Sequence, residues 1–186
     1  VTRTFRALQD NRALNGGRFS SLQKAVAEES GERVVIQYSR LATGANAGAS
    51  LVQEGEPADN LEHETVESIS IDDVLEEFVP ADRPVVLKLD VEGMEVPALR
   101  GATRLAGRDW LLIYEDHGND VSCRATEFVL TLDASLFLVT RQGKVHRVDT
   151  LDRVRKFKTD SRTGYNFFAA SRGGVFEKRL AEAASA

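Results

Sequence analysis

The sequence predicts an α/β fold with a mainly parallel sheet. Short apolar runs rich in strand-forming residues alternate with stretches of helical periodicity, and this order is typical of strands joined by right-handed helical crossovers. The run Val85–Leu89 is almost continuously apolar, which suits a strand covered on both faces. The last two expected strands, 136–140 and 165–170, are joined by a polar helix or loop at 148–157, which allows a hairpin-like antiparallel edge.

Local patterns predict the individual elements. The first helix has Phe5, Leu8 and Leu14 at roughly helical spacing and is followed by two glycines. Ser70 and Asp73 form a capping-box-like start for a second helix. Strands are expected at 19–27, 33–38, 67–71, 85–89, 110–115, 136–140 and 165–170, and helices at 4–15, 73–78, 94–106 and 127–132. Glycine, proline and small residues predict a surface loop at 42–60.

Length and composition indicate an ordinary globular protein. The 186 residues suit one domain, which we place at 1–172 with a C-terminal tail at 173–186. With 42% hydrophobic and 28% charged residues, the chain can bury a substantial core. The net charge is −5 and the basic residues are scattered except near 153–158, so no nucleic-acid partner is expected.

Several features bear on the compartment. Cys123 is the single cysteine, which excludes an internal disulfide and suits a reducing cytoplasm. No apolar segment is long enough to span a bilayer and no signal peptide opens the chain, so we expect a cytoplasmic protein without a membrane partner. Val1 is not an initiator methionine, and we therefore expect a fragment or a trimmed segment.

Two carboxylates follow the apolar strand at 85–89. Asp90 and Glu92 stand at its carboxyl end, Gly93 allows a sharp turn, and Pro97 suits the first turn of the next helix. Ligands bind at this rim in open α/β sheets. The pair suits a metal ion, a general base or a cationic ligand, and it equally suits capping of the following helix.

Glu115 and His117 end the next expected strand, so four ionisable groups should converge on one rim. Such crowding favours either a base or a divalent cation held by oxygen ligands. His117 is the natural base without a metal, although it could also serve as a cap or a turn contact. A divalent metal stays possible, but no third carboxylate has a fixed register and we assign no metal ligand. Lys88 needs a partner, such as Glu115.

The segment Leu87–Glu95, LKLDVEGME, resembles the signature of FkbM-type methyltransferases. Residues 65–75, 99–102 and 111–117 resemble the segments that flank it in this family, and the resemblance covers about residues 5–170. It implies a class I methyltransferase (Rossmann-like) sheet with an antiparallel C-terminal edge strand. It also implies S-adenosylmethionine as cofactor, with O-methylation of a sugar or other hydroxylated small molecule.

The resemblance further implies a first strand, Gly-rich turn and helix that hold the cofactor, and no such unit precedes Thr4. We therefore expect an incomplete sheet and little activity from this chain alone. The chain would be cut from a longer polypeptide, be an inactive remnant, or be completed by another chain. Ala25, Val26 and Ala27 match the family segment that lines the adenine pocket, but ordinary core packing also accounts for them.

Two other classes of function stay open at this point. The chain could be a non-catalytic methyltransferase-like scaffold that binds a partner. It could also be a divalent-metal hydrolase built on Asp90 and Glu92.

Overall fold

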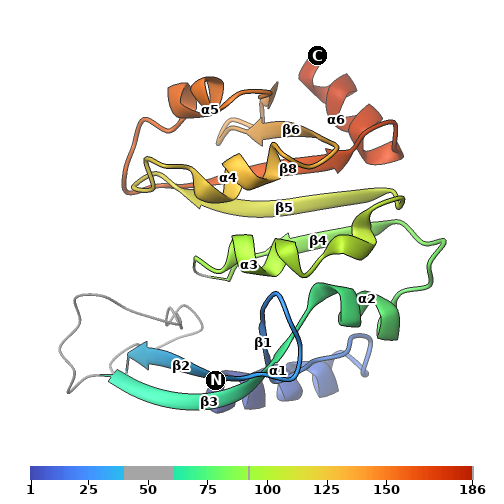
Figure 1. Cartoon of the computed structure of the whole chain (residues 1–186), viewed down its shortest axis with the longest axis vertical. Coiled ribbons are helices and arrows are strands. Elements are labelled where there is room, and N and C mark those ends of the chain that lie inside the picture. Colours follow the sequence, from blue (N-terminus) through green and yellow to red (C-terminus); the bar gives the residue numbers. More distant parts are fainter. Residues whose placement is uncertain (40–60, 92, 186) are drawn as a thin grey trace. The chain divides into compact units, whose positions relative to one another are not determined.

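The computed structural model describes residues 1–39, 61–91 and 93–185. They fall into two compact units, one of Val1–Val74 with Val91–Gly101 and the other of Leu75–Asp90 with Ala102–Ala186. The described strands form two sheets, of three and five strands (Figure 1). The predicted loop at 42–60 and residue Glu92 lie outside the described residues.

The first unit contains the three-stranded sheet, with strand order β1-β3-β2. β1 (Lys24–Val26) pairs in parallel with β3 (Leu61–Ile69), and β2 (Arg33–Ser39) pairs with β3 in the antiparallel direction. The strand expected at 19–27 is therefore shorter than predicted, because only its last residues find a partner in β3. The helix α1 (Thr2–Leu14) precedes this sheet, as expected.

Two local contacts fix the start of the helix α2 (Ile71–Phe78) and the end of the helix α3 (Glu95–Arg100). The hydroxyl of Ser70 accepts a hydrogen bond from the Asp73 N–H at 3.1 Å, which confirms the predicted start of α2. α3 ends at Gly101, where a Cβ would lie only 2.8 Å from the carbonyl oxygen of Ala27. This close approach explains why the residue at 101 is a glycine.

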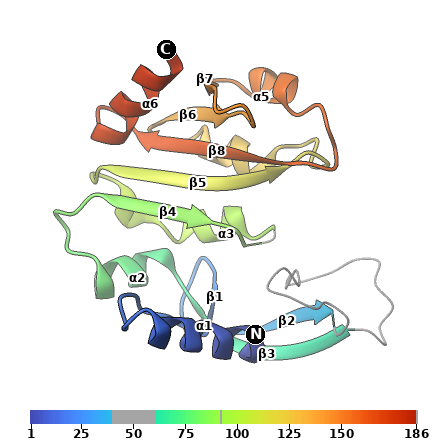
Figure 2. The same ribbon diagram turned by 180° about the vertical axis from the view of Figure 1, so that it is seen from behind.

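The second unit contains the five-stranded sheet, with strand order β4-β5-β8-β6-β7 (Figure 2). Its strands are β4 (Val85–Leu89), β5 (Trp110–His117), β6 (Ala134–Val139), β7 (Val145–Arg147) and β8 (Gly164–Ser171). Its helices are a 3₁₀ turn (Thr103–Leu105), α4 (Arg124–Val129), α5 (Leu151–Phe157) and α6 (Val175–Ser185).

The pairing in this sheet corrects two expectations. β4 and β5 are parallel, but β5–β8, β6–β8 and β6–β7 are antiparallel, so the described sheet is mixed and not mainly parallel. The last strand is antiparallel as expected, yet it lies between β5 and β6, and the edge belongs to β7. The sequence pattern missed β7 because a tight turn, and not a helix, joins it to β6.

The strand β4 is exposed on one face. Val85 and Leu89 are buried, whereas Val86 is 59% exposed and the Lys88 side chain is 61% exposed. The expectation of a strand covered on both faces is therefore wrong for the described structure. Among the described strands β4 pairs only with β5, so its other side is an open sheet edge whose backbone N–H and C=O groups have no strand partner among them.

The core of the second unit lies along β5, β6 and β8. Leu112, Phe137, Phe167 and Ala169 are fully buried, and the rings of Tyr114 and Phe167 stack with centroids 5.6 Å apart. Such aromatic pairs contribute about 0.5–1.5 kcal/mol beyond the burial of their area. None of the helices in the described part of the chain is long and apolar enough to cross a membrane.

Candidate functional site

The parallel strands β4 and β5 bring the predicted rim residues together at the carboxyl ends of the two strands. Leu89 pairs with Tyr114, so Asp90 and Glu115 are the next residues along two neighbouring strands. The predicted adjacency of these two strands is confirmed, and the chemical roles of the two carboxylates stay predictions.

Asp90 has a partner on its own strand. The Lys88 ammonium lies 2.6 Å from the Asp90 carboxylate, and both side chains are more than half exposed, at 61% and 52%. We expected Lys88 to pair with Glu115, but residues two apart share a face and Asp90 is the nearer carboxylate. An exposed pair of this kind contributes only about 0–1 kcal/mol to stability.

The carboxylate of Glu115 lies against Gly164 of β8. A Cβ at position 164 would be only 1.2 Å from Glu115 Oε1, so the carboxylate occupies the space that a side chain would need there. Within the described part of the chain, Glu115 has no hydrogen bond or ion pair through its side chain. Sequence reasoning missed Gly164, because its importance arises from a pairing between strands far apart in the chain.

His117 lies beside Glu115 on the same face of β5, since the two residues are two positions apart. It is exposed and pairs in register with Gly164. The Glu115 carboxylate fills the space above this glycine. The sheet therefore gathers a free carboxylate and an imidazole at the end of β5.

The residue between them, Asp116, points to the opposite face and is buried. Lys158 donates to its carboxylate at 2.6 Å and to the carbonyl oxygen of Asp120 at 2.7 Å, and the Lys158 and Asp116 side chains are 4% and 2% exposed. Thr126 donates to the second carboxylate oxygen at 2.5 Å and accepts a hydrogen bond from the Tyr114 hydroxyl. This network holds the end of β5 in one position.

The turn after β5 is fixed by Asp120. Burial opposes the charge of this carboxylate, but the hydroxyl of Ser122 and the N–H groups of Arg124 and Ser122 donate to it, and Lys158 adds a nearby positive charge. The hydrogen bonds and the cation outweigh burial and lower the pKa of Asp120 below its ordinary value. Asp120 therefore caps the first turn of α4.

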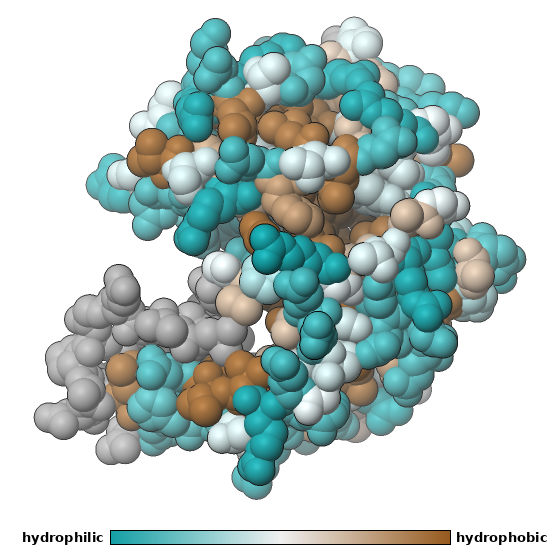
Figure 3. All heavy atoms as spheres, viewed as in Figure 1, coloured by the Kyte–Doolittle hydropathy of each residue, from teal (hydrophilic) through white to brown (hydrophobic). Residues whose placement is uncertain are grey.

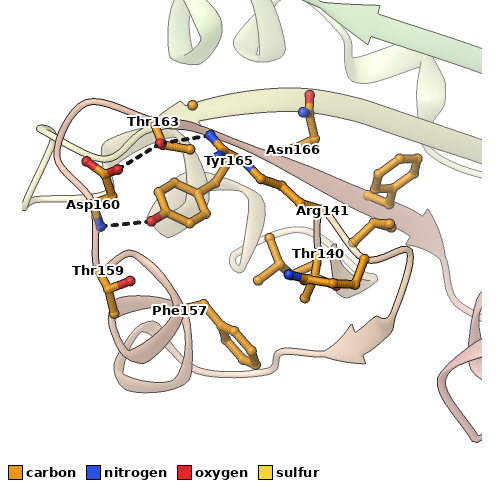
Figure 4. A pocket seen from close by; sticks show the side chains of 13 residues that line it. Thr140, Arg141, Phe157, Thr159, Asp160, Thr163, Tyr165 and Asn166 are labelled. Atoms are coloured by element: carbon orange, nitrogen blue, oxygen red, sulfur yellow. Dashed lines mark hydrogen bonds between the residues drawn. The ribbon is translucent and has the colours of Figure 1, made fainter.

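A cavity of about 540 Å³ opens beside the start of β8 (Figure 4). Its lining includes Thr140, Arg141, Phe157, Asp160, Tyr165 and Asn166. This volume lies within the range of about 300–1,000 Å³ that is usual for small-molecule sites. Gly164 is also part of the lining, so the Glu115 carboxylate lies directly against the wall of the cavity.

Hydrogen bonds hold the loop before β8 in place at the cavity. The Asp160 N–H donates to the Tyr165 hydroxyl at 2.9 Å, and Arg141 donates to the Thr163 hydroxyl at 3.0 Å (Figure 4). Backbone donation from Arg162 is the largest cause that lowers the pKa of Asp160. The loop also packs on Gly118, where a Cβ would lie 2.0 Å from the Asp160 carbonyl oxygen.

Residues 3–145 match the family described as the Methyltransferase FkbM domain, and the match spans more than half of the chain. The chain belongs to this family. No curated protein and no solved structure matches it. Membership makes the chain methyltransferase-related, and methyltransferases of this kind generally use S-adenosylmethionine.

The residues predicted to line the adenine pocket of an FkbM methyltransferase are half-buried in the first unit. Ala25 and Val26 belong to β1, and the Ala27 N–H donates to the carbonyl oxygen of Ile69 at 3.0 Å. Their backbone thus continues the pairing with β3, and their contact with the cofactor stays a prediction.

The described residues do not complete a cofactor pocket or a metal centre. Within the described ranges no Gly-rich turn links a strand to a helix in the way that S-adenosylmethionine binding requires. The same residues contain no group of three or more His, Cys, Asp or Glu side chains placed to hold a metal ion. The divalent metal considered from the sequence therefore has no support here.

Proposed function

We propose that this chain carries the acceptor side of an S-adenosylmethionine-dependent O-methyltransferase that acts on a hydroxylated small molecule. The observation that carries the proposal is the position of Glu115 and His117 beside Gly164 at the wall of the cavity. Family membership supports the reaction type, and the cavity supports a small acceptor.

The cofactor supplies the methyl group, and the chain's own residues prepare the acceptor hydroxyl. In our proposal the neutral imidazole of His117 takes the proton from that hydroxyl as the oxygen becomes nucleophilic. Glu115 lies on the same face of β5, two residues before His117. A positioned base of this kind accounts for about 10²–10⁴-fold in rate.

We further propose that a strand and a Gly-rich turn from outside the described residues complete the sheet at β4. The open edge of β4 among the described strands supports this, because an added strand would pair its backbone groups. Asp90 would then stand next to the cofactor.

The test is methyl transfer by the complete natural polypeptide with a panel of hydroxylated acceptors. We expect His117→Gln to lower turnover by about 10²-fold or more and Glu115→Gln to lower it by about 10-fold or more. Wild-type turnover in His117→Gln would exclude His117 as the base. If EDTA abolished turnover and Mg²⁺ restored it, a bound metal ion, and not His117, would activate the acceptor hydroxyl.

The second candidate is a non-catalytic scaffold that binds a partner protein. Exposed hydrophobic side chains favour it, since Val86, Val121 and Val175 are all more than half exposed. Hydrophobic side chains also reach the surface of the second unit on the side where α4 and α5 are seen (Figure 3). Calorimetry decides between the two candidates, because a scaffold would bind no S-adenosylmethionine even in the complete polypeptide.

A further inference from the structure

We propose that the cavity beside β8 binds a hydroxylated small molecule that carries one anionic group, either a carboxylate or a phosphate. This names the acceptor class and rests on the proposed function. The anionic group would lie on Arg141, and the hydroxylated body would lie between the aromatic side chains and Asn166.

Arg141 is the cation of the cavity lining. Within the described residues its guanidinium donates a hydrogen bond to the neutral hydroxyl of Thr163, which leaves its other donors available. Asp160, the carboxylate of the lining, pairs with Arg162, whose guanidinium lies 3.6 Å from it, and the charge of Arg141 also helps to lower the pKa of Asp160. A planar guanidinium with free donors matches a carboxylate or a phosphate in a bidentate manner.

The rest of the lining suits a compact molecule with one apolar face and several hydroxyls. Phe157, Tyr165 and Phe168 offer aromatic surface, and the Phe157 ring makes a tilted contact with the His146 ring at 4.9 Å between centroids. Asn166 adds an exposed amide with both donors and an acceptor. Aromatic walls with a few polar groups are the usual design of a small-molecule site.

The geometry also orients the ligand. Arg141 follows β6, whereas Asn166 pairs in register with Glu115 on β5. The Arg141 guanidinium reaches Thr163, the residue before Gly164, so an anion on it would lie near the His117 end of β5 and the hydroxylated body would extend along β8 towards Asn166. The anionic group would thus hold the ligand close to the proposed base.

Nuclear magnetic resonance titration of the ¹⁵N-labelled chain tests the inference. The probes are D-glucuronate, D-glucose 6-phosphate and uncharged D-glucose at equal ionic strength. We expect both anions, or one of them, to shift the amide signals of residues 140–142 and 164–166 and to bind at least ~10-fold more tightly than glucose, a difference of about 1.4 kcal/mol. A preference between the two anions identifies carboxylate or phosphate as the group that is bound.

Two matched variants make the result specific. Arg141→Gln should weaken anion binding about 10-fold, whereas Arg172→Gln, which removes the same charge from a 55% exposed side chain outside the lining, should change it less than 2-fold. Arg141→Lys keeps the positive charge and should keep part of the preference for the anions over glucose. Equal binding of glucose and both anions, or equal effects of the two glutamine variants, would overturn the inference.

This titration needs neither cofactor nor turnover, so it can fail or succeed separately from the proposed function. Anion binding without methyl transfer by the complete polypeptide would support the site and reject the reaction. Methyl transfer to uncharged acceptors without anion binding would support the reaction and reject this acceptor class.

Discussion

Replacing Lys158 by methionine should strongly destabilise the second unit. The substitution keeps most of the side-chain volume but leaves the Asp116 carboxylate, 2% exposed, without its cation. Thr126 would remain as the described donor to that carboxylate. Breaking a buried ion pair from one side costs about 3–5 kcal/mol, because the remaining charge is neither solvated nor paired.

Lys88→Met is the matched control. The Lys88–Asp90 pair has the same 2.6 Å separation as the Lys158–Asp116 pair, but its side chains are 61% and 52% exposed instead of 4% and 2%. Exposed pairs are worth about 0–1 kcal/mol. The two variants therefore remove equally short ion pairs that differ in burial.

Urea unfolding followed by the fluorescence of Trp110 measures both effects. Trp110 is the single tryptophan, is buried, and belongs to β5, so its signal reports on the second unit. For a protein of this size about 3–5 kcal/mol also corresponds to a fall in melting temperature of roughly 6–20 °C. A Lys158→Met variant within about 1 kcal/mol of Lys88→Met would refute the argument that burial decides the value of the pair.

The remaining predictions concern the rim, two glycines and pH. In the complete polypeptide, Asp90→Asn should lower turnover at least ~10²-fold while Lys88→Met leaves it within about 3-fold; equal losses would make the carboxylate only an ion-pair partner. Gly118→Ala should lower the free energy of unfolding by about 1–3 kcal/mol, because its Cβ would lie 2.0 Å from the backbone carbonyl oxygen of Asp160. Gly164→Ala should lower it less, because only the flexible carboxylate of Glu115 must move. Urea unfolding compares the two variants. Asp120→Asn should cost about 0.5–2 kcal/mol at pH 7. Because the folded-state pKa of Asp120 is lowered, that difference should be present above pH ~4 and fade as pH falls through the folded-state pKa; a difference unchanged at pH 3 would contradict it.

The local parts of the site could be predicted from the sequence. The signature Leu87–Glu95 gave the family, and the two apolar runs gave β4 and β5 as neighbours with Asp90 and Glu115 at their ends. Ser70 marked the start of α2 through its hydroxyl. Each of these depends on residues close together in the chain, where periodicity and capping chemistry are informative.

The cavity could not be predicted in the same way. It depends on the antiparallel pairing of β8 with β5, about fifty residues earlier in the chain, and with β6, about thirty residues earlier. Gly164 and Lys158 carry no local pattern that separates them from an ordinary turn glycine or a solvated lysine. Their roles arise only when Glu115 and Asp116 lie beside them.

The buried pair of Lys158 and Asp116 links the two parts of the proposed site. Asp116 stands between Glu115 and His117, and Lys158 stands between Phe157 and Thr159, which both line the cavity. An apolar pair of similar volume would stabilise the fold about as well, so stability alone does not explain buried charges here. Because both side chains are buried and Lys158 also donates to the carbonyl oxygen of Asp120, the pair restrains the cavity wall next to the end of β5 that carries the proposed base. The chemistry proposed for His117 requires that restraint, because a base acts only within hydrogen-bond reach of the proton it removes.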